Sequence, residues 1–103
     1  MKIKQTERSL ISESIQFACA VSPIPHKFYK VMRFFKIELP EKQSNGAPIT
    51  EWTIPEELKM PIKSALQVYI ETLNNNGPIP PSFEFHYSTE EANAIYKSLL
   101  DKF

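Results

Sequence analysis

Nine prolines and only two glycines punctuate these 103 residues, and this pairing constrains the fold more than any other feature. Proline fixes φ and has no N–H to donate, so inside a helix it causes a kink, and in strands it is confined to edges. Glycine supplies the positive φ that tight turns and phosphate-cradling loops need. Such loops are scarce here, because Gly46 follows Asn45 in a turn signal and Gly77 stands just before Pro78.

The helical pattern is clearest over 55–75, where apolar residues recur at three- and four-residue spacing. Thr53 and Glu56 have the spacing of a capping box at its start, and Gly77 suits the C′ position at its end. Pro61 conflicts with this helix unless it kinks the helix or lies in the first turn. The pattern therefore predicts a helix over 55–75, but it does not determine the first residue of that helix.

Two further helices are predicted. Ser88 and Glu91 have capping-box spacing in front of a periodic apolar face, which predicts a helix over 89–103. A proline at the first position favours a helix over 25–36. Its end is open, because alternating residues after Arg33 also fit a short strand.

Three short segments carry strand signals. Aromatic residues alternate with polar ones over 83–87, and β-branched residues and a tryptophan fill 49–54 between prolines. Apolar residues also alternate over 15–21, although a helical spacing fits that segment equally. The sequence therefore predicts a small single α+β domain, with about three helices packed on a short antiparallel sheet and a flexible loop at 40–48.

Several features bear on the compartment of the protein. Cys19 is the only cysteine, so no internal disulfide can form, and a reducing environment is favoured. The N-terminal MKIKQTERS lacks the apolar run of a secretory signal. No apolar run approaches the ~20 residues of a membrane span. We therefore expect a cytoplasmic protein with no membrane segment.

Few residues could carry chemistry. Cys19 and His26 could act as nucleophile and base, but Cys19 lies in an apolar stretch typical of a small buried side chain. His86 lies between Phe85 and Tyr87, on the face opposite the aromatic side chains. It is therefore expected to face solvent, where a carboxylate can pair with it. Two distant histidines and one cysteine have no metal-ligand spacing, and both phosphate-binding glycine motifs are absent from the sequence. We expect no enzyme activity, metal or cofactor; an enzyme would need a site assembled from distant residues.

Charge is divided along the chain although it sums to zero. Residues 1–36 carry seven Lys/Arg and two acids, whereas residues 37–103 carry five Lys and ten acids. Cations and rings alternate in PHKFYKVMRFFK, and such a segment suits an acidic protein face or a nucleic acid. The predicted partner-binding residues lie in this stretch: His26, Lys27, Tyr29, Lys30, Arg33, Phe34 and Lys36.

Residues 63–82 read KSALQVYIETLNNNGPIPPS. They resemble the end of a helix and the following Gly-x-x-Ile-Pro-x-Pro-like turn in HicB-type antitoxins, over about a fifth of the chain. The acidic, glycine-containing strand region near the start of those antitoxins is not recognisable here. The resemblance implies that antitoxin-like regulators belong among the nucleic-acid-binding alternatives.

These patterns favour a small intracellular, non-enzymatic protein-interaction module, a regulator or inhibitor that binds and occludes a partner surface. A nucleic-acid-binding protein that uses 26–37 is the alternative, although four cations on one face are few for strong phosphate binding. A homodimer that docks the basic half on the acidic half also fits the charge division. The exposure of Tyr29 and Phe34 decides whether the basic segment is a binding site or only a solvated face.

Overall fold

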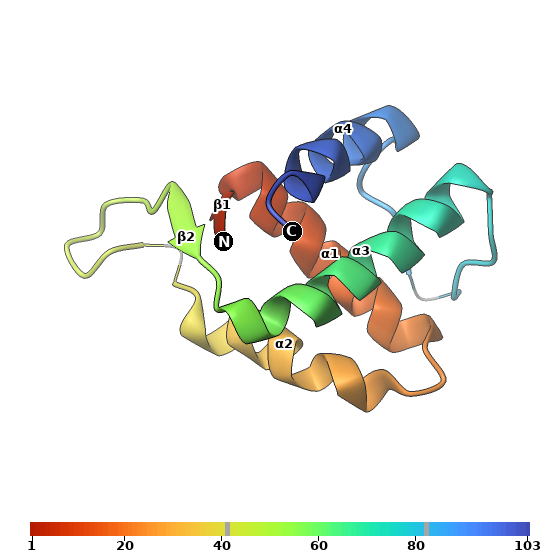
Figure 1. Cartoon of the computed structure of the whole chain (residues 1–103), viewed down its shortest axis with the longest axis horizontal. Coiled ribbons are helices and arrows are strands. Elements are labelled where there is room, and N and C mark those ends of the chain that lie inside the picture. Colours follow the sequence, from red (N-terminus) through yellow and green to blue (C-terminus); the bar gives the residue numbers. More distant parts are fainter. Residues whose placement is uncertain (41, 82) are drawn as a thin grey trace.

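The computed structural model describes residues 1–40, 42–81 and 83–103. Within them the chain forms four α-helices and a two-stranded antiparallel sheet, a mostly helical α+β architecture (Figure 1). The helix count exceeds the predicted three by one. The helices and strands are β1 (Lys2–Lys4), α1 (Gln5–Val21), α2 (Tyr29–Arg33), β2 (Glu51–Thr53), α3 (Lys59–Asn74) and α4 (Thr89–Leu100).

Helix α1 replaces the strand predicted near 15–21, and that prediction is wrong. Residues 5–21 form one helix of 17 residues. In a strand, the alternating side chains would share one face and one degree of burial. Instead Phe17 is buried, Cys19 is half-buried and Val21 is exposed. The buried face of α1 is wide, so Ile15 and Phe17 are both buried although they lie two positions apart. This spacing produces the strand-like alternation in the sequence.

The sheet joins the first residues of the chain to the middle. The strand predicted at 49–54 is confirmed as β2, and its antiparallel partner is β1, with Ile3 opposite Trp52. Both of these side chains are buried. The pairing continues beyond the strands, because the Ile54 N–H donates to the Met1 carbonyl at 2.7 Å.

The prediction of a strand at 83–87 is wrong, although the predicted alternation of partly buried and exposed side chains is confirmed. This segment lies between helices and pairs with no strand in the described chain. Phe83, Phe85 and Tyr87 are half-buried, and the residues between them are exposed. The rings of Phe83 and Phe17 lie 5.0 Å apart, and those of Phe85 and Tyr69 lie 4.9 Å apart, both edge-on. Edge-to-face packing on α1 and α3 therefore takes the place of a hydrogen-bonded ladder.

The helix predicted over 25–36 is present but irregular. A 3-10 turn, η1 (Pro25–Phe28), leads into α2, and a π-helical turn, η2 (Phe34–Glu38), follows. The alternative strand after Arg33 is not formed. Apolar side chains spaced by three or four residues face the core throughout, namely Phe28, Val31, Phe35 and Leu39.

The predicted helix over 55–75 begins with a 3-10 turn, η3 (Glu56–Leu58), and continues as α3. Pro61 lies in the first turn of α3, where a backbone N–H has no acceptor inside the helix, so the proline removes nothing. The capping box predicted at Thr53 is wrong, because Thr53 ends β2 instead.

The other helix ends follow local chemistry. Asn76, not Gly77, takes the left-handed position after α3, with φ of 48°. The Gly77 N–H then donates to the Thr72 carbonyl at 2.9 Å, which closes the helix end. At α4 the predicted capping box is confirmed, since Ser88 and Glu91 exchange two hydrogen bonds of 3.2 Å.

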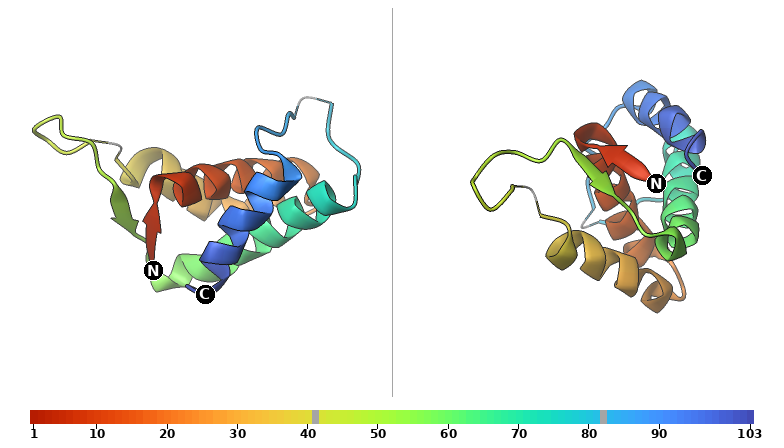
Figure 2. Two further views of the ribbon diagram at one scale, coloured as in Figure 1. Left: turned by 90° about the horizontal axis from the view of Figure 1, so that it is seen from above. Right: turned by 60° about the vertical axis from the view of Figure 1, so that its left-hand side comes forward.

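The helices share one apolar core. Helix α1 contacts α2, α3 and α4, and α2 and α4 lie on opposite sides of the α1–α3 pair (Figures 1 and 2). The two chain ends lie close together in every view, and the connection before β2 projects away from the helices (Figure 2). No helix in the described parts of the chain has the length and apolar character needed to cross a membrane.

A buried carboxylate ties the two chain ends together. Glu7 accepts hydrogen bonds from the Lys4 N–H at 2.9 Å, the Ser98 hydroxyl at 3.0 Å and the Lys102 ammonium at 2.8 Å. The Lys102 ammonium also donates to the Lys2 carbonyl at 2.8 Å. Burial by itself would raise the pKa of Glu7, but these donors and the Lys102 charge together lower it. These five residues form the terminal junction.

Candidate functional site

The seven predicted partner-binding residues lie on η1, α2 and η2 and form the basic surface. Six of their side chains are exposed and Phe34 is half-buried. The Phe34 ring packs edge-on against Phe35 at 5.9 Å. Tyr29 keeps 51% of its surface exposed. Of the two rings, Tyr29 therefore offers an accessible face, whereas Phe34 contributes mainly to packing.

The cations of the basic surface are not neutralised by any residue that the structure describes. No salt bridge within the described residues involves Lys27, Lys30, Arg33 or Lys36. The Lys27 ammonium lies 5.0 Å from the Phe28 ring centre, a cation–π contact that leaves its charge in place. Because no described residue pairs with these charges, we expect them to be available to an anionic partner.

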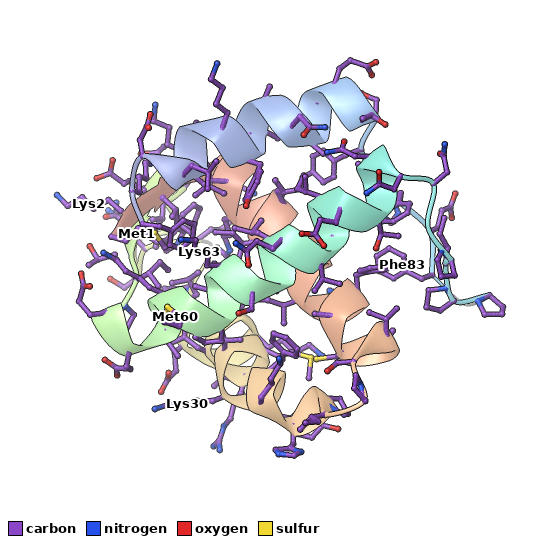
Figure 3. All side chains as sticks on the ribbon, turned by 45° about the vertical axis from the view of Figure 1, so that its right-hand side comes forward. Met1, Lys2, Lys30, Met60, Lys63 and Phe83 are labelled. Carbon is purple, nitrogen blue, oxygen red and sulfur yellow. The ribbon has the colours of Figure 1, made fainter. Side chains whose placement is uncertain are left out.

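Apolar side chains extend the basic surface beyond the predicted set. Ile37, in η2, is 70% exposed, and Met60, at the start of α3, is 72% exposed. Figure 3 shows Lys30 projecting outward from α2 and Met60 from the first turn of α3. Ile37 was detectable as an apolar residue on the basic side of a helical wheel. Met60 had no such signal, because only the fold brings α3 next to α2.

A second feature is a polar groove of about 810 Å³ beside α1. Its lining includes Ser12 and Gln16 from α1, Lys36 from η2, Lys42 and the exposed His86. The groove therefore meets the basic surface at Lys36. Neither Cys19 nor His26 lines it.

The side chain of Glu13 connects the groove to the core. The Glu13 side chain is only 11% exposed, and its carboxylate accepts a hydrogen bond from the Tyr69 hydroxyl. It also accepts from the His86 backbone N–H at 3.2 Å and contacts His86 Nδ1 at 2.5 Å. A carboxylate can only accept, so Nδ1 carries the proton in this contact. The expected carboxylate partner of His86 is thus Glu13. The sequence did not identify it, because Glu13 meets His86 only when the segment that includes 15–21 is a helix.

Burial controls the acidity of the groups around this network. Desolvation, followed by the hydrogen bond and charge of Glu13, raises the pKa of Tyr69, so its hydroxyl remains a donor. Burial also raises the pKa of Tyr87, against the effect of a hydrogen bond with Ser9.

The pKa of the Cys19 thiol is raised by burial despite the nearby Lys36 charge. Cys19 therefore stays a protonated thiol, a poor nucleophile.

Arg8 lies at the edge of the groove but has a structural role. Its guanidinium donates to the Leu39 carbonyl at 2.7 Å and to the Pro40 carbonyl at 3.3 Å. It also lies 4.5 Å from the centre of the Trp52 ring. These contacts hold the end of η2 against α1 and β2, so both terminal nitrogens of Arg8 already donate to backbone carbonyls.

Comparison of the chain with protein-family models, with curated proteins and with solved structures gives no match. The resemblance of residues 63–82 to HicB-type antitoxins stays a prediction. The basic surface and the polar groove are therefore the features from which function can be argued.

Proposed function

We propose that this chain is a small non-enzymatic protein-interaction module that binds an acidic face of another protein through the basic surface. By covering that face it would act as a regulator or inhibitor of the partner. The observation that carries the proposal is the set of four cations around an exposed Tyr29 ring, none of which forms a salt bridge with a described residue. The single cysteine favours the cytoplasm as the setting.

The composition of the surface favours a protein partner. Tyrosine and arginine are the residue types that most often dominate the binding energy of protein interfaces, and Tyr29 and Arg33 are both exposed. Ile37 and Met60 add exposed apolar area, which can be buried against a protein but gains nothing from a phosphate backbone. The flanking lysines would steer an acidic partner and set its orientation.

A nucleic acid is the second candidate, and Tyr29 supports it, because an exposed ring among cations can stack on a base. Strong phosphate binders usually make more contacts than four cations provide. A mobility assay with single-stranded and duplex probes at low salt separates the two candidates. A shift whose affinity falls steeply and linearly with log salt would support nucleic-acid binding in place of the protein partner.

Site-specific photocrosslinking tests the proposal in the native host. A benzophenone amino acid replaces Tyr29 in one variant and Lys97, which is exposed on the distant α4, in a control. We expect one protein adduct from position 29 and none from position 97, with the linked partner peptide rich in Asp and Glu. An adduct with nucleic acid, an adduct only with a second copy of this chain, or no adduct at position 29 would contradict the proposal.

A further inference from the structure

We propose that the polar groove beside α1 binds a small phosphorylated molecule, with His86 and Lys36 contacting its phosphate group. The inference does not depend on the proposed function, because it concerns the groove and not the acidic partner. It rests on the orientation of one imidazole, on the charge of the groove, and on the size and polarity of the lining.

The imidazole of His86 is held in a defined orientation. Its Nδ1–H donates to the carboxylate of the half-buried Glu13 at 2.5 Å, while 72% of the His86 side chain remains exposed. The opposite ring nitrogen, Nε2, has no hydrogen-bond partner among the described residues. The Nδ1–H···Glu13 contact fixes the plane of the ring, and Nε2, when it carries a proton, can donate to an oxyanion. The groups that face this network are Glu13 on α1, Tyr69 on α3, and Tyr87, the neighbour of His86 in the chain.

The charge of the groove favours an anion. Arg8, Lys36 and Lys42 are permanent cations in the described lining, against one carboxylate, Glu13. Glu13 already accepts hydrogen bonds from Tyr69 and His86, and Arg8 is engaged with backbone carbonyls. The two lysines form no salt bridge with described residues. These two lysines can meet the two charges of a phosphate monoester, and the His86 ring offers a further hydrogen-bonding group beside them.

The lining indicates the rest of the ligand. Ser12 and Gln16 offer a hydroxyl and an amide beside the cations, and Phe35 and Ile37 supply an apolar part of the wall. A volume of about 810 Å³ is within the range of small-molecule sites and exceeds what a free phosphate ion fills. A phosphate ester with a small polar body matches the cations and the polar side chains Ser12 and Gln16 of the lining.

The test is an NMR titration of the full chain at constant ionic strength with two probes, inorganic phosphate and glycerol 3-phosphate. We expect saturable shifts at Ser12, Gln16, Lys36 and His86, with millimolar affinity and tighter binding of the ester. Shifts spread over lysines throughout the molecule, or no saturation below about 50 mM, would overturn the proposal. Binding of inorganic phosphate without the ester would overturn the choice of ligand.

Matched variants locate the site. His86→Gln and Lys36→Gln should each weaken binding of glycerol 3-phosphate at least about fivefold, because each removes one charge-assisted hydrogen bond. His26→Gln and Lys30→Gln, on the basic surface, should leave it unchanged. Equal affinity of His86→Gln and the parent chain would contradict the assignment.

Discussion

The terminal junction and the basic surface use the same side chain in opposite ways. At the terminal junction, the Lys102 ammonium lies 2.8 Å from the Glu7 carboxylate and also donates to a backbone carbonyl. On the basic surface, Lys30 is exposed and forms no salt bridge with any described residue. Position in the fold, and not residue type, decides whether a lysine stabilises the molecule or remains free to bind.

This difference predicts opposite mutational behaviour. Removing one partner of a partially buried ion pair destabilises the folded state, because it leaves the other charge uncompensated. Exposed charges away from such contacts change stability by less than about 0.5 kcal/mol. The Glu13 network stands between these cases, because it is buried on the Tyr69 side and open on the His86 side.

The largest expected effect is at the terminal junction. Glu7→Gln should lower the free energy of unfolding by about 2–3 kcal/mol, because the charge-assisted bond to Lys102 is lost. Urea unfolding measures this, with the exposed Glu57→Gln as the control. If the two variants were equally stable, the terminal junction would not be a source of stability.

The Glu13 network should show an intermediate effect. Tyr69→Phe removes a buried donor from Glu13 and should cost about 1–2 kcal/mol of unfolding free energy. Tyr29→Phe, the control on the basic surface, should have no measurable effect, because the Tyr29 side chain is exposed. A larger loss for Tyr29→Phe than for Tyr69→Phe would reverse the comparison.

The pH dependence of stability should also separate the regions. The pKa of Glu7 lies below its ordinary value of 4.5 in the folded chain, so the unfolded chain binds more protons there. The contribution of Glu7 is therefore present above pH 4.5 and is lost as the pH falls through the folded pKa. Glu7→Gln should lose stability less steeply than the parent chain below pH 4.5. Parallel acid-unfolding curves would contradict this.

Much of the helical framework could be predicted from the sequence. The apolar spacing of α3, the capping box at Ser88 and the strand around Trp52 are local signals, and each formed in the structure. Prediction failed where one sequence pattern fits two structures and tertiary contacts decide between them. The alternation over 83–87 marks a segment that is half-buried against helices, because the neighbouring rings come from α1 and α3.

The candidate sites differ in the same way. The basic surface lies within one segment, so its cations and Tyr29 could be placed from the sequence alone. The polar groove could not, because Glu13 and His86 are 73 residues apart and their contact requires α1 to be a helix. The contribution of Met60 likewise depends on the fold, which packs α3 against η1.

The smallest expected effect on stability, and the most direct test of the account, is charge reversal on the basic surface. Lys30→Glu and the matched α4 variant Lys97→Glu should both unfold within about 0.5 kcal/mol of the parent chain. Binding to the photocrosslinked partner is then measured by calorimetry. The account predicts that Lys30→Glu weakens binding about tenfold or more, because it puts a repulsive charge at an acidic partner, and that Lys97→Glu changes it less than about twofold. Equal affinities of the two variants for the partner would contradict it.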